Sequence, residues 1–368
     1  MAVNIGYRDD RPLELSVGEL TGALGDSVTV IPLVVALGAL TPLSVPRILL
    51  WFGVFQIVWG VAYGLPLSVE PMKALAGLAI AGSLGVPELL AAGLLTGGVL
   101  LVSGRLGLLA RLQGLVSTPL VRGIQLAVAL VLAVAAVDLV AANPVLAVAG
   151  VLAVVLVALA GRPQAGALVV LGLGVGMAVS TAGVPTPTLP ALAIFPEGLP
   201  ALSPAVAEGT LAQLATSVGN AAVATSLLCA DLFDADVPAD DLAGSMGAMT
   251  LVAVPFGGFP MCHGSGGLAG KHAFGARTGG ANLLLGVLYL VGALVAGVVT
   301  AIPSALLGVV LVVVAYHLGR TAVDSENRAL TVAVGLLGPL ASIGVAFVVG
   351  AVADSLLARL PAERRPFR

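Results

Sequence analysis

The chain is dominated by long apolar runs, each bounded by proline, glycine or a charged residue. A helix needs about 20 apolar residues to cross a bilayer. Runs of this kind predict spans at 17–40, 47–63, 86–103, 119–139, 145–161, 165–182, 209–230, 241–257, 279–300, 303–319, 329–341 and 343–358. Only 10% of the residues are charged and 59% are hydrophobic, whereas a soluble domain has about 25% charged residues. The sequence therefore predicts an all-α polytopic membrane protein without a sizeable soluble domain.

Two further apolar stretches, 66–82 and 260–276, begin with proline and polar residues. Each leaves only about a dozen helix-compatible positions, too few to cross a bilayer as helix alone. We expect each to be an extended piece followed by a half-helix, at 71–82 and 264–276. They would be segments 3 and 10 of fourteen.

A weak internal repeat relates the two halves of the chain. "ELTGALGD" at 19–26 aligns with "QLATSVGN" at 213–220, and the same offset places "GLP" at 64–66 over "GFP" at 258–260. Seven passes per half is an odd number, so the second half would be inverted. Inverted repeats with interrupted helices are typical of secondary transporters, which bind substrate at the interruptions. We therefore predict one repeat over 1–183, an external linker over 184–208 and a second, inverted repeat over 209–368.

Basic residues orient the chain, because Lys and Arg accumulate in cytoplasmic loops. With fourteen passes and both ends inside, thirteen of the sixteen Lys and Arg residues fall on the cytoplasmic side. Lys271 and Arg277 belong to this set as loop residues, whereas Arg47 falls in an outer loop and Lys73 and Arg122 lie within or at the start of segments. We predict a multi-pass protein of the cell membrane with both termini in the cytoplasm.

The first break, "PLSVEPMKALAG", holds three residues with chemical consequences. Pro71 suits the first helical position and Glu70 the capping position before it. Lys73 would then lie in the first turn, where the helix dipole opposes a cation. Its compensating anion would be either Glu70, in a pair that only holds the break together, or a bound substrate.

The second break, "FPMCHGSGGLAG", is rich in glycine. Gly264, Gly266 and Gly267, with Ser265, would allow the backbone to approach a ligand and direct amide N–H groups at it. Two half-helix N-termini that face each other across a small gap would form an anion site, with His263 at its mouth as a neutral donor. The alternative is a closely packed helix with a hydrogen-bonded core histidine.

Other polar side chains within the predicted spans are candidates for a coupling network. Asp26 lies in the middle of the first span and aligns with Asn220 in the repeat. It would carry a coupling proton or accept hydrogen bonds from amides at a break. Gln56 and Gln213 are weaker candidates of the same kind.

Enzymatic and metal-dependent functions find little support. Ser265 and Asp26 miss the GxSG and GxGD patterns of intramembrane proteases. The cysteines, Cys229 and Cys262, have no metal-binding spacing, and the chain has no ATP-binding P-loop. We expect no catalytic residue, metal, cofactor or nucleic-acid partner, and a gradient as the energy source.

Three segments carry a family resemblance: "GELTGALGDSVTVIPLVVAL", "GLPLSVEPMKALAGLAI" and "GGFPMCHGSGGLAGKHAFGARTGG". The chain resembles, over most of its length, the molybdate transporter family of plants and microbes, related to SulP sulfate permeases. The resemblance implies the fourteen-pass inverted-repeat fold of SulP and uracil permeases, with core and gate subdomains and frequent homodimers. It also implies transport of molybdate, a tetrahedral oxyanion. One departure is Glu70, where the family often has glutamine. We also expect no C-terminal STAS domain of the kind that SulP proteins carry.

The breaks and the resemblance together predict a secondary active importer of molybdate, with tungstate and sulfate as further candidate anions. Alternatives are another oxyanion permease, a nucleobase permease of the same fold or, in a different class, an intramembrane hydrolase. The expected coupling network is Asp26, Gln56, Glu70, Gln213 and Asn220. The expected substrate ligands are Ser68, Lys73, His263, Gly264, Ser265, Gly266 and Gly267.

Overall fold

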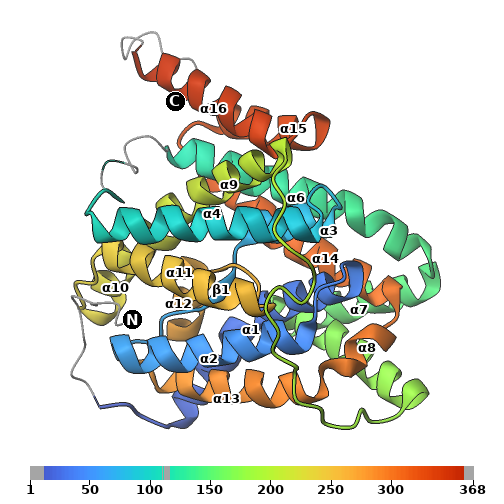
Figure 1. Ribbon diagram of the computed structural model, residues 1–368. Coiled ribbons are helices and arrows are strands. Elements are labelled where there is room, and N and C mark those ends of the chain that lie inside the picture. Colours follow the sequence, from blue (N-terminus) through green and yellow to red (C-terminus); the bar gives the residue numbers. More distant parts are fainter. Residues whose placement is uncertain (1–11, 110, 112–116, 360–368) are drawn as a thin grey trace.

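The computed structural model describes residues 12–109, 111 and 117–359, and almost every element in them is a helix (Figure 1). The first half contains α1 (Val17–Leu40), α2 (Val45–Tyr63), β1 (Glu70–Pro71), α3 (Lys73–Ile80), α4 (Val86–Arg105), α6 (Thr118–Ala141), α7 (Pro144–Leu159), η1 (Pro163–Ala165) and α8 (Gly166–Ala182). The second half contains α9 (Pro204–Thr216), η2 (Ser217–Ala224), α10 (Thr225–Phe233), α11 (Ala239–Ala253), η3 (Val254–Phe256), β2 (Met261–Cys262), α12 (Ser265–Ala273), α13 (Gly280–Val295), η4 (Ala296–Ala301), α14 (Ser304–Gly319), η5 (Arg320–Asp324), α15 (Arg328–Leu340) and α16 (Ile343–Arg359).

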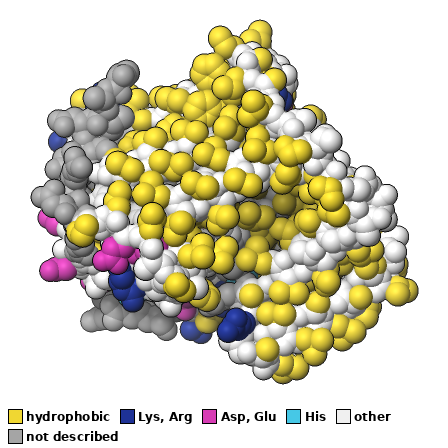
Figure 2. Space-filling view, turned by 90° about the horizontal axis from the view of Figure 1, so that it is seen from below, with side chains coloured by type: hydrophobic (Ala, Val, Ile, Leu, Met, Phe, Trp, Pro, Cys, Tyr) yellow, Lys and Arg dark blue, Asp and Glu magenta, His cyan; other side chains and the backbone are white. Residues whose placement is uncertain are grey.

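The predicted all-α, fourteen-segment architecture is confirmed. Among the described residues, seven continuous helical runs are at least 18 residues long and apolar enough to cross a membrane, the longest being Pro204–Phe233 with 30 residues. Leucine and valine supply most of the exposed large apolar side chains, and hydrophobic side chains cover most of the face drawn in Figure 2. Such a surface suits lipid rather than water.

Local sequence signals account for the helix ends. Ser16 caps α1 by accepting a hydrogen bond from the amide of Glu19, and Gly64 ends α2 in the left-handed conformation with φ of 71°, which glycine adopts without a steric penalty. The Glu19 carboxylate in turn accepts hydrogen bonds from the amides of Thr278 and Ala281. The start of α1 is thereby tied to the start of α13.

Packing divides the helices into two bundles. The core bundle comprises α1–α4 and α9–α13, and the gate bundle comprises α6–α8 and α14–α16. The bundles meet where α1 contacts α14, α3 contacts α6 and α9 contacts α16. Both interrupted segments belong to the core bundle, with the gate bundle beside them (Figure 1).

The two interrupted segments cross each other at their extended pieces. Strands β1 and β2 pair antiparallel, with Glu70 opposite Cys262 and Pro71 opposite Met261. The half-helices that follow, α3 and α12, have only eight and nine residues, or about 12–14 Å at 1.5 Å per residue. Because each strand leads into its own half-helix and the strands are antiparallel, both helical N-termini flank the strand pair.

The predicted start of the first half-helix was wrong by two residues. Strand pairing holds Glu70 and Pro71 extended, and the Met72 amide donates to the Pro260 carbonyl, 2.9 Å away. Helix α3 therefore begins at Lys73, and Met72 rather than Glu70 occupies the capping position, without a side-chain cap. The Glu70 side chain is thus free of a capping role.

Candidate functional site

Glu70 lies at the centre of the space between the two breaks. A Cβ atom added to Gly264 or Gly267 would collide with its carboxylate. These two glycines therefore let the first turn of α12 close around the carboxylate, a close approach that only glycine permits. A helix N-terminus favours anions, and at α12 the Glu70 carboxylate already occupies this position.

Lys73 is the cationic partner of this carboxylate. Its Nζ atom lies 2.5 Å from Glu70 Oε2, and the exposed fractions of the two side chains are 29% and 1%. Lys73 occupies the first position of α3, as expected for the first turn. Lys73 therefore pairs with Glu70. From the sequence, this pair, which would only hold the break together, is the alternative to a bound substrate.

Gln213 caps the N-terminus of α3 from the neighbouring helix α9. Its Oε1 atom accepts hydrogen bonds from the amides of Ala74 at 3.0 Å and Leu75 at 3.4 Å. Its Nε2 atom donates to Ser217 Oγ. A neutral amide oxygen thus satisfies the free amides of this half-helix.

Among the described residues, no side chain caps the N-terminus of α12 through a hydrogen bond, although the Glu70 carboxylate lies against its first turn. Gly264 at its capping position makes no side-chain cap, and Gly266 faces open space. Ser265 Oγ donates to Asn220 Oδ1 at 3.0 Å. Asn220 lies in η2, a π-helical stretch within the α9–α10 run, and such stretches are frequent at functional sites.

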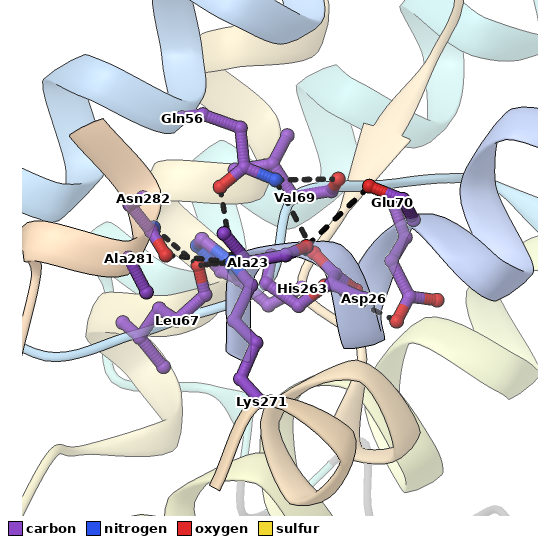
Figure 3. Close-up of polar contacts among 12 residues, drawn as sticks. Ala23, Asp26, Gln56, Leu67, Val69, Glu70, His263, Lys271, Ala281 and Asn282 are labelled. Carbon is purple, nitrogen blue, oxygen red and sulfur yellow. Dashed lines mark hydrogen bonds and ion pairs between the residues drawn. The ribbon is translucent and has the colours of Figure 1, made fainter. Parts of the chain in front are cut away.

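Behind Glu70, a fully buried polar network joins α1, α2, α12 and α13 (Figure 3). Lys271 Nζ lies 3.2 Å from Asp26 Oδ2 and donates to Asn282 Oδ1 at 2.6 Å and to Gln56 Oε1 at 3.2 Å. The placement of Lys271 in a cytoplasmic loop was therefore wrong, since its side chain is buried in the core bundle. A buried cation of this kind requires a paired carboxylate, which Asp26 supplies.

Ser68 connects this network to Glu70. Its Oγ atom lies 2.6 Å from Asp26 Oδ1 and 3.2 Å from Glu70 Oε1. A serine hydroxyl carries one hydrogen, which the shorter contact assigns to Asp26. The contact between Ser68 and Glu70 is then a hydrogen bond when Glu70 itself carries a proton.

The same connection recurs in the second half of the chain. Asp26, on the first helix of the first half, accepts from Ser68 at the first break, and Asn220, on the first helix of the second half, accepts from Ser265 at the second. The alignment of Asp26 with Asn220 thus pairs two residues in equivalent surroundings.

His263 is buried rather than at the mouth of the site. Its Nε2 atom lies 2.8 Å from Ser245 Oγ and its Nδ1 atom 2.9 Å from the Ser68 carbonyl oxygen. The rings of Trp59 and Tyr63 meet the imidazole edge to face. Both ring nitrogens are engaged, so His263 positions the Ser68 backbone in this structure.

A cavity of about 430 Å³ separates the breaks from the gate bundle. Lys73, Asn220, Ser265, Gly266 and Gly267 line it from the core bundle. The facing wall consists of residues from α6, α8, α14 and η5, including Arg122, Gln125, His317, Arg320 and Thr321.

A second cavity, of about 30 Å³, lies deeper between the two breaks. Its lining includes Glu70, Lys73, Gln125, Gln213 and Asn220. It has room for about two water molecules. A tetrahedral oxyanion, with four oxygens, requires more space.

Sequence reasoning missed several members of this site. Asn282 and Gln125 are neutral side chains in largely apolar segments. Lys271 was assigned to a loop because positive charges near segment ends are typically cytoplasmic. Arg122, inside an apolar segment, was the clearest available signal of a functional cation. Within the part of the chain that the structure describes, no cluster of three or more His, Cys, Asp or Glu side chains could hold a metal ion.

Comparison with known proteins identifies relatives. The sequence profile of a family described as "Molybdate transporter of MFS superfamily" matches residues 18–132 and 205–318. Molybdate transporter 1 of Arabidopsis thaliana is 31% identical over 93% of this chain and 87% of its own length. Molybdate transporter 2 of the same plant is 28% identical over 89% of this chain and 84% of its own length.

Solved structures share the fold. The transmembrane domain of the cyanobacterial bicarbonate transporter BicA superposes with a TM-score of 0.68 at 17% identity, covering 94% of this chain and 98% of that one. The murine Solute Carrier 26 family member A9 anion transporter, in the inward-facing state, gives a TM-score of 0.67 at 15% identity, covering 95% and 69%. The predicted SulP-like inverted-repeat fold is therefore confirmed.

Proposed function

The chain belongs to the molybdate transporter family, and we propose that it imports molybdate by binding the dianion between the two interrupted segments. The observation that carries this proposal is the uncapped N-terminus of α12, which opens at Gly266 into a cavity with Lys73 in its wall. Free amides at a helix N-terminus and a nearby ammonium are favourable partners of an oxyanion.

In this proposal the ligands are the Lys73 ammonium, the Ser265 hydroxyl and the amides of the first turn of α12. Ser68 and His263 act as positioning residues, since both are fully buried and hydrogen-bonded to other protein groups. Gly264 and Gly267 provide the close backbone approach. A nucleobase fits less well, because among the described residues Phe274 is the only phenylalanine, tyrosine or tryptophan that lines the large cavity.

The charge balance of the site supports coupling to protons. Two carboxylates, Asp26 and Glu70, face two ammonium groups, Lys73 and Lys271, with His263 nearby. A dianion adds two negative charges that these four groups by themselves do not offset, which is costly within a membrane protein. Uptake of a proton offsets one of them.

Glu70 is the proposed proton carrier. Its contact with Ser68 becomes a hydrogen bond when Glu70 is protonated, and protonation also releases Lys73 to the substrate. The small cavity beside the pair does not hold the anion while Glu70 occupies its present position. Proton uptake by Glu70 and anion entry are thereby linked, as secondary active transport requires.

Movement of the core bundle against the gate bundle would expose the site to each side in turn. The large cavity extends to Phe274, Arg320 and Thr321. Phe274 lies near the end of the predicted segment 260–276, and Arg320 and Thr321 follow the predicted span 303–319. Both segments are predicted to end in the cytoplasm. The proposed orientation, with both termini cytoplasmic, makes this an inward-open cavity.

Uptake into liposomes tests the proposal. Purified protein should accumulate molybdate when the outside is more acidic, tungstate should compete because it has the same charge and shape, and sulfate should compete less. Gly266→Val, which blocks backbone approach, should abolish this uptake. Wild-type liposomes that take up no molybdate under any proton gradient would refute the function, and equal uptake without a gradient would refute proton coupling.

A further inference from the structure

The gate-bundle wall of the large cavity carries a separate group of cationic and polar side chains. Arg122 and Gln125 come from α6, whereas His317, Arg320 and Thr321 come from α14 and η5. No aspartate or glutamate of the described chain lines the cavity. A cleft that is lined by charges of one sign concentrates ions of the opposite sign. This wall therefore favours anions independently of the two breaks.

Arg122 is the half-buried arginine of this wall, whereas Arg320 is exposed. Its Nη1 atom donates to Gln125 Oε1 at 3.1 Å, while its Nε atom is buried and finds no acceptor among the described residues. No carboxylate in the described ranges forms an ion pair with it. An unpaired cation inside a membrane segment is costly and typically marks an ion pathway.

Gln125 determines how the guanidinium is held. Its Oε1 atom also accepts a hydrogen bond from Thr321 Oγ1 at 2.9 Å, so one acceptor joins α6 to η5 and fixes one edge of Arg122. Because Nε is buried, recognition of an oxyanion would fall to the two terminal Nη groups, whose other N–H bonds have no hydrogen-bond partner among the described residues. Such a pair of Nη groups can bind an oxyanion in a bidentate manner.

Gln125 also places Arg122 close to the proposed substrate site. It lines the small cavity together with Glu70 and Lys73. Arg122 precedes it by three residues on the same helix, about 4.5 Å along the axis. An anion held by Arg122 would thus be roughly one helical turn from the site between the breaks.

We propose that Arg122, oriented by Gln125, forms a second oxyanion-binding position in the gate wall. The position holds the tetrahedral dianion between the open end of the cavity and the site at the breaks. This inference rests on the proposed function, since it assumes the same anion. The competing explanation is that Arg122 only braces α6 against η5 through Gln125.

Binding measurements on purified protein separate these explanations. Molybdate is titrated into the wild type, Arg122→Gln, Arg122→Lys and the control Arg162→Gln at several NaCl concentrations. Arg162 is an exposed residue of the α7–α8 connection outside the cavity, so its variant loses one charge without touching the site.

If Arg122 binds the anion, Arg122→Gln should weaken apparent affinity by about ten- to a hundredfold at low salt and flatten its salt dependence. Arg122→Lys keeps the charge but loses the planar guanidinium, so its affinity should lie between those of Arg122→Gln and the wild type. The affinity of Arg162→Gln should match that of the wild type. An Arg122→Gln protein with wild-type affinity and salt dependence overturns the second site alone. A wild type that binds no molybdate overturns the proposed function and this site with it.

A measurement on the wild type avoids any folding defect of the variants. Tungstate soaked into crystals serves as an anomalous scatterer with the geometry of molybdate. A tungsten peak close enough for the tungstate oxygens to accept hydrogen bonds from the Arg122 guanidinium, in addition to a peak at the first turn of α12, supports the proposal. A peak at α12 alone, at saturating tungstate, overturns it.

Discussion

Replacing Glu70 by glutamine isolates the contribution of its charge to anion binding. The amide has nearly the same shape, can still contact Ser68 and does not repel a dianion. In the present structure the carboxylate lies against the first turn of α12 and 2.5 Å from Lys73 Nζ. The proposed substrate would therefore bind next to this charge or replace its contacts.

The expected magnitude has an upper bound. Two unit charges 4 Å apart interact by about 4 kcal/mol at an effective dielectric constant of 20, so a dianion and a charged Glu70 repel by about 8 kcal/mol. The wild type avoids this repulsion by taking up a proton. The variant is spared the free energy of that protonation, which is smaller than the repulsion that protonation relieves. Since Lys73 also loses its partner and the site relaxes, we expect a ten- to hundredfold gain, or about 1.4–2.8 kcal/mol.

The pH dependence provides a second signature. If binding takes up a proton at Glu70, wild-type affinity should rise as pH falls, by up to about tenfold per pH unit. Glu70→Gln should bind with little dependence on pH between about pH 6 and pH 8. Lys73→Ala is the matched opposite, because it removes the cation and should weaken binding by about ten- to a hundredfold.

Isothermal titration with molybdate, at several pH values and in buffers of different ionisation enthalpy, measures both affinity and proton uptake. Thermal unfolding without ligand verifies folding, and we expect only a small destabilisation of Glu70→Gln because Lys73 is 29% exposed and such pairs contribute little. A Glu70→Gln protein that binds more weakly than the wild type, or that keeps the wild-type pH slope, would refute the proposed role of Glu70.

Three further predictions concern packing, the buried network and topology. Gly267→Ala should lower the free energy of unfolding by about 1–3 kcal/mol, measured by thermal unfolding, because the added Cβ would collide with Glu70, Ser68 and Asp26. Gly266→Ala is the control, since its Cβ meets open space, and it should not lower stability. Equal effects of the two substitutions would contradict the close packing at Gly267. Lys271→Met should destabilise by about 3–5 kcal/mol by removing the ammonium group that offsets the buried Asp26 carboxylate, and addition of Asp26→Asn should recover much of this in a double-mutant cycle. A reporter that is active only in the cytoplasm, fused to the C-terminus, should be active, and an inactive fusion in well-expressed membranes would contradict the proposed orientation.

Most of the fold could be predicted from the sequence, because apolar length and helix breakers decide where a chain can cross a bilayer. The first span, 17–40, coincides with α1, and the breaks at 66–82 and 260–276 become β1–α3 and β2–α12. The start of α3 could not be predicted, because the pairing of Glu70 with Cys262 joins residues nearly 200 positions apart. Proline at the first helical turn is a local preference, and here a long-range contact overrides it.

The sequence alone also placed Ser265, Lys73 and Glu70 at the breaks, since polar residues within apolar segments are conspicuous. Only the tertiary structure decided their partners. It turned His263 inward to Ser245, brought Gln213 onto the amides of α3 and buried Lys271 against Asp26. The local sequence around a charged residue near the end of a segment does not reveal whether its side chain faces water or a carboxylate on another helix. The difference lies in how α1 packs against α12, and that packing depends on the whole chain.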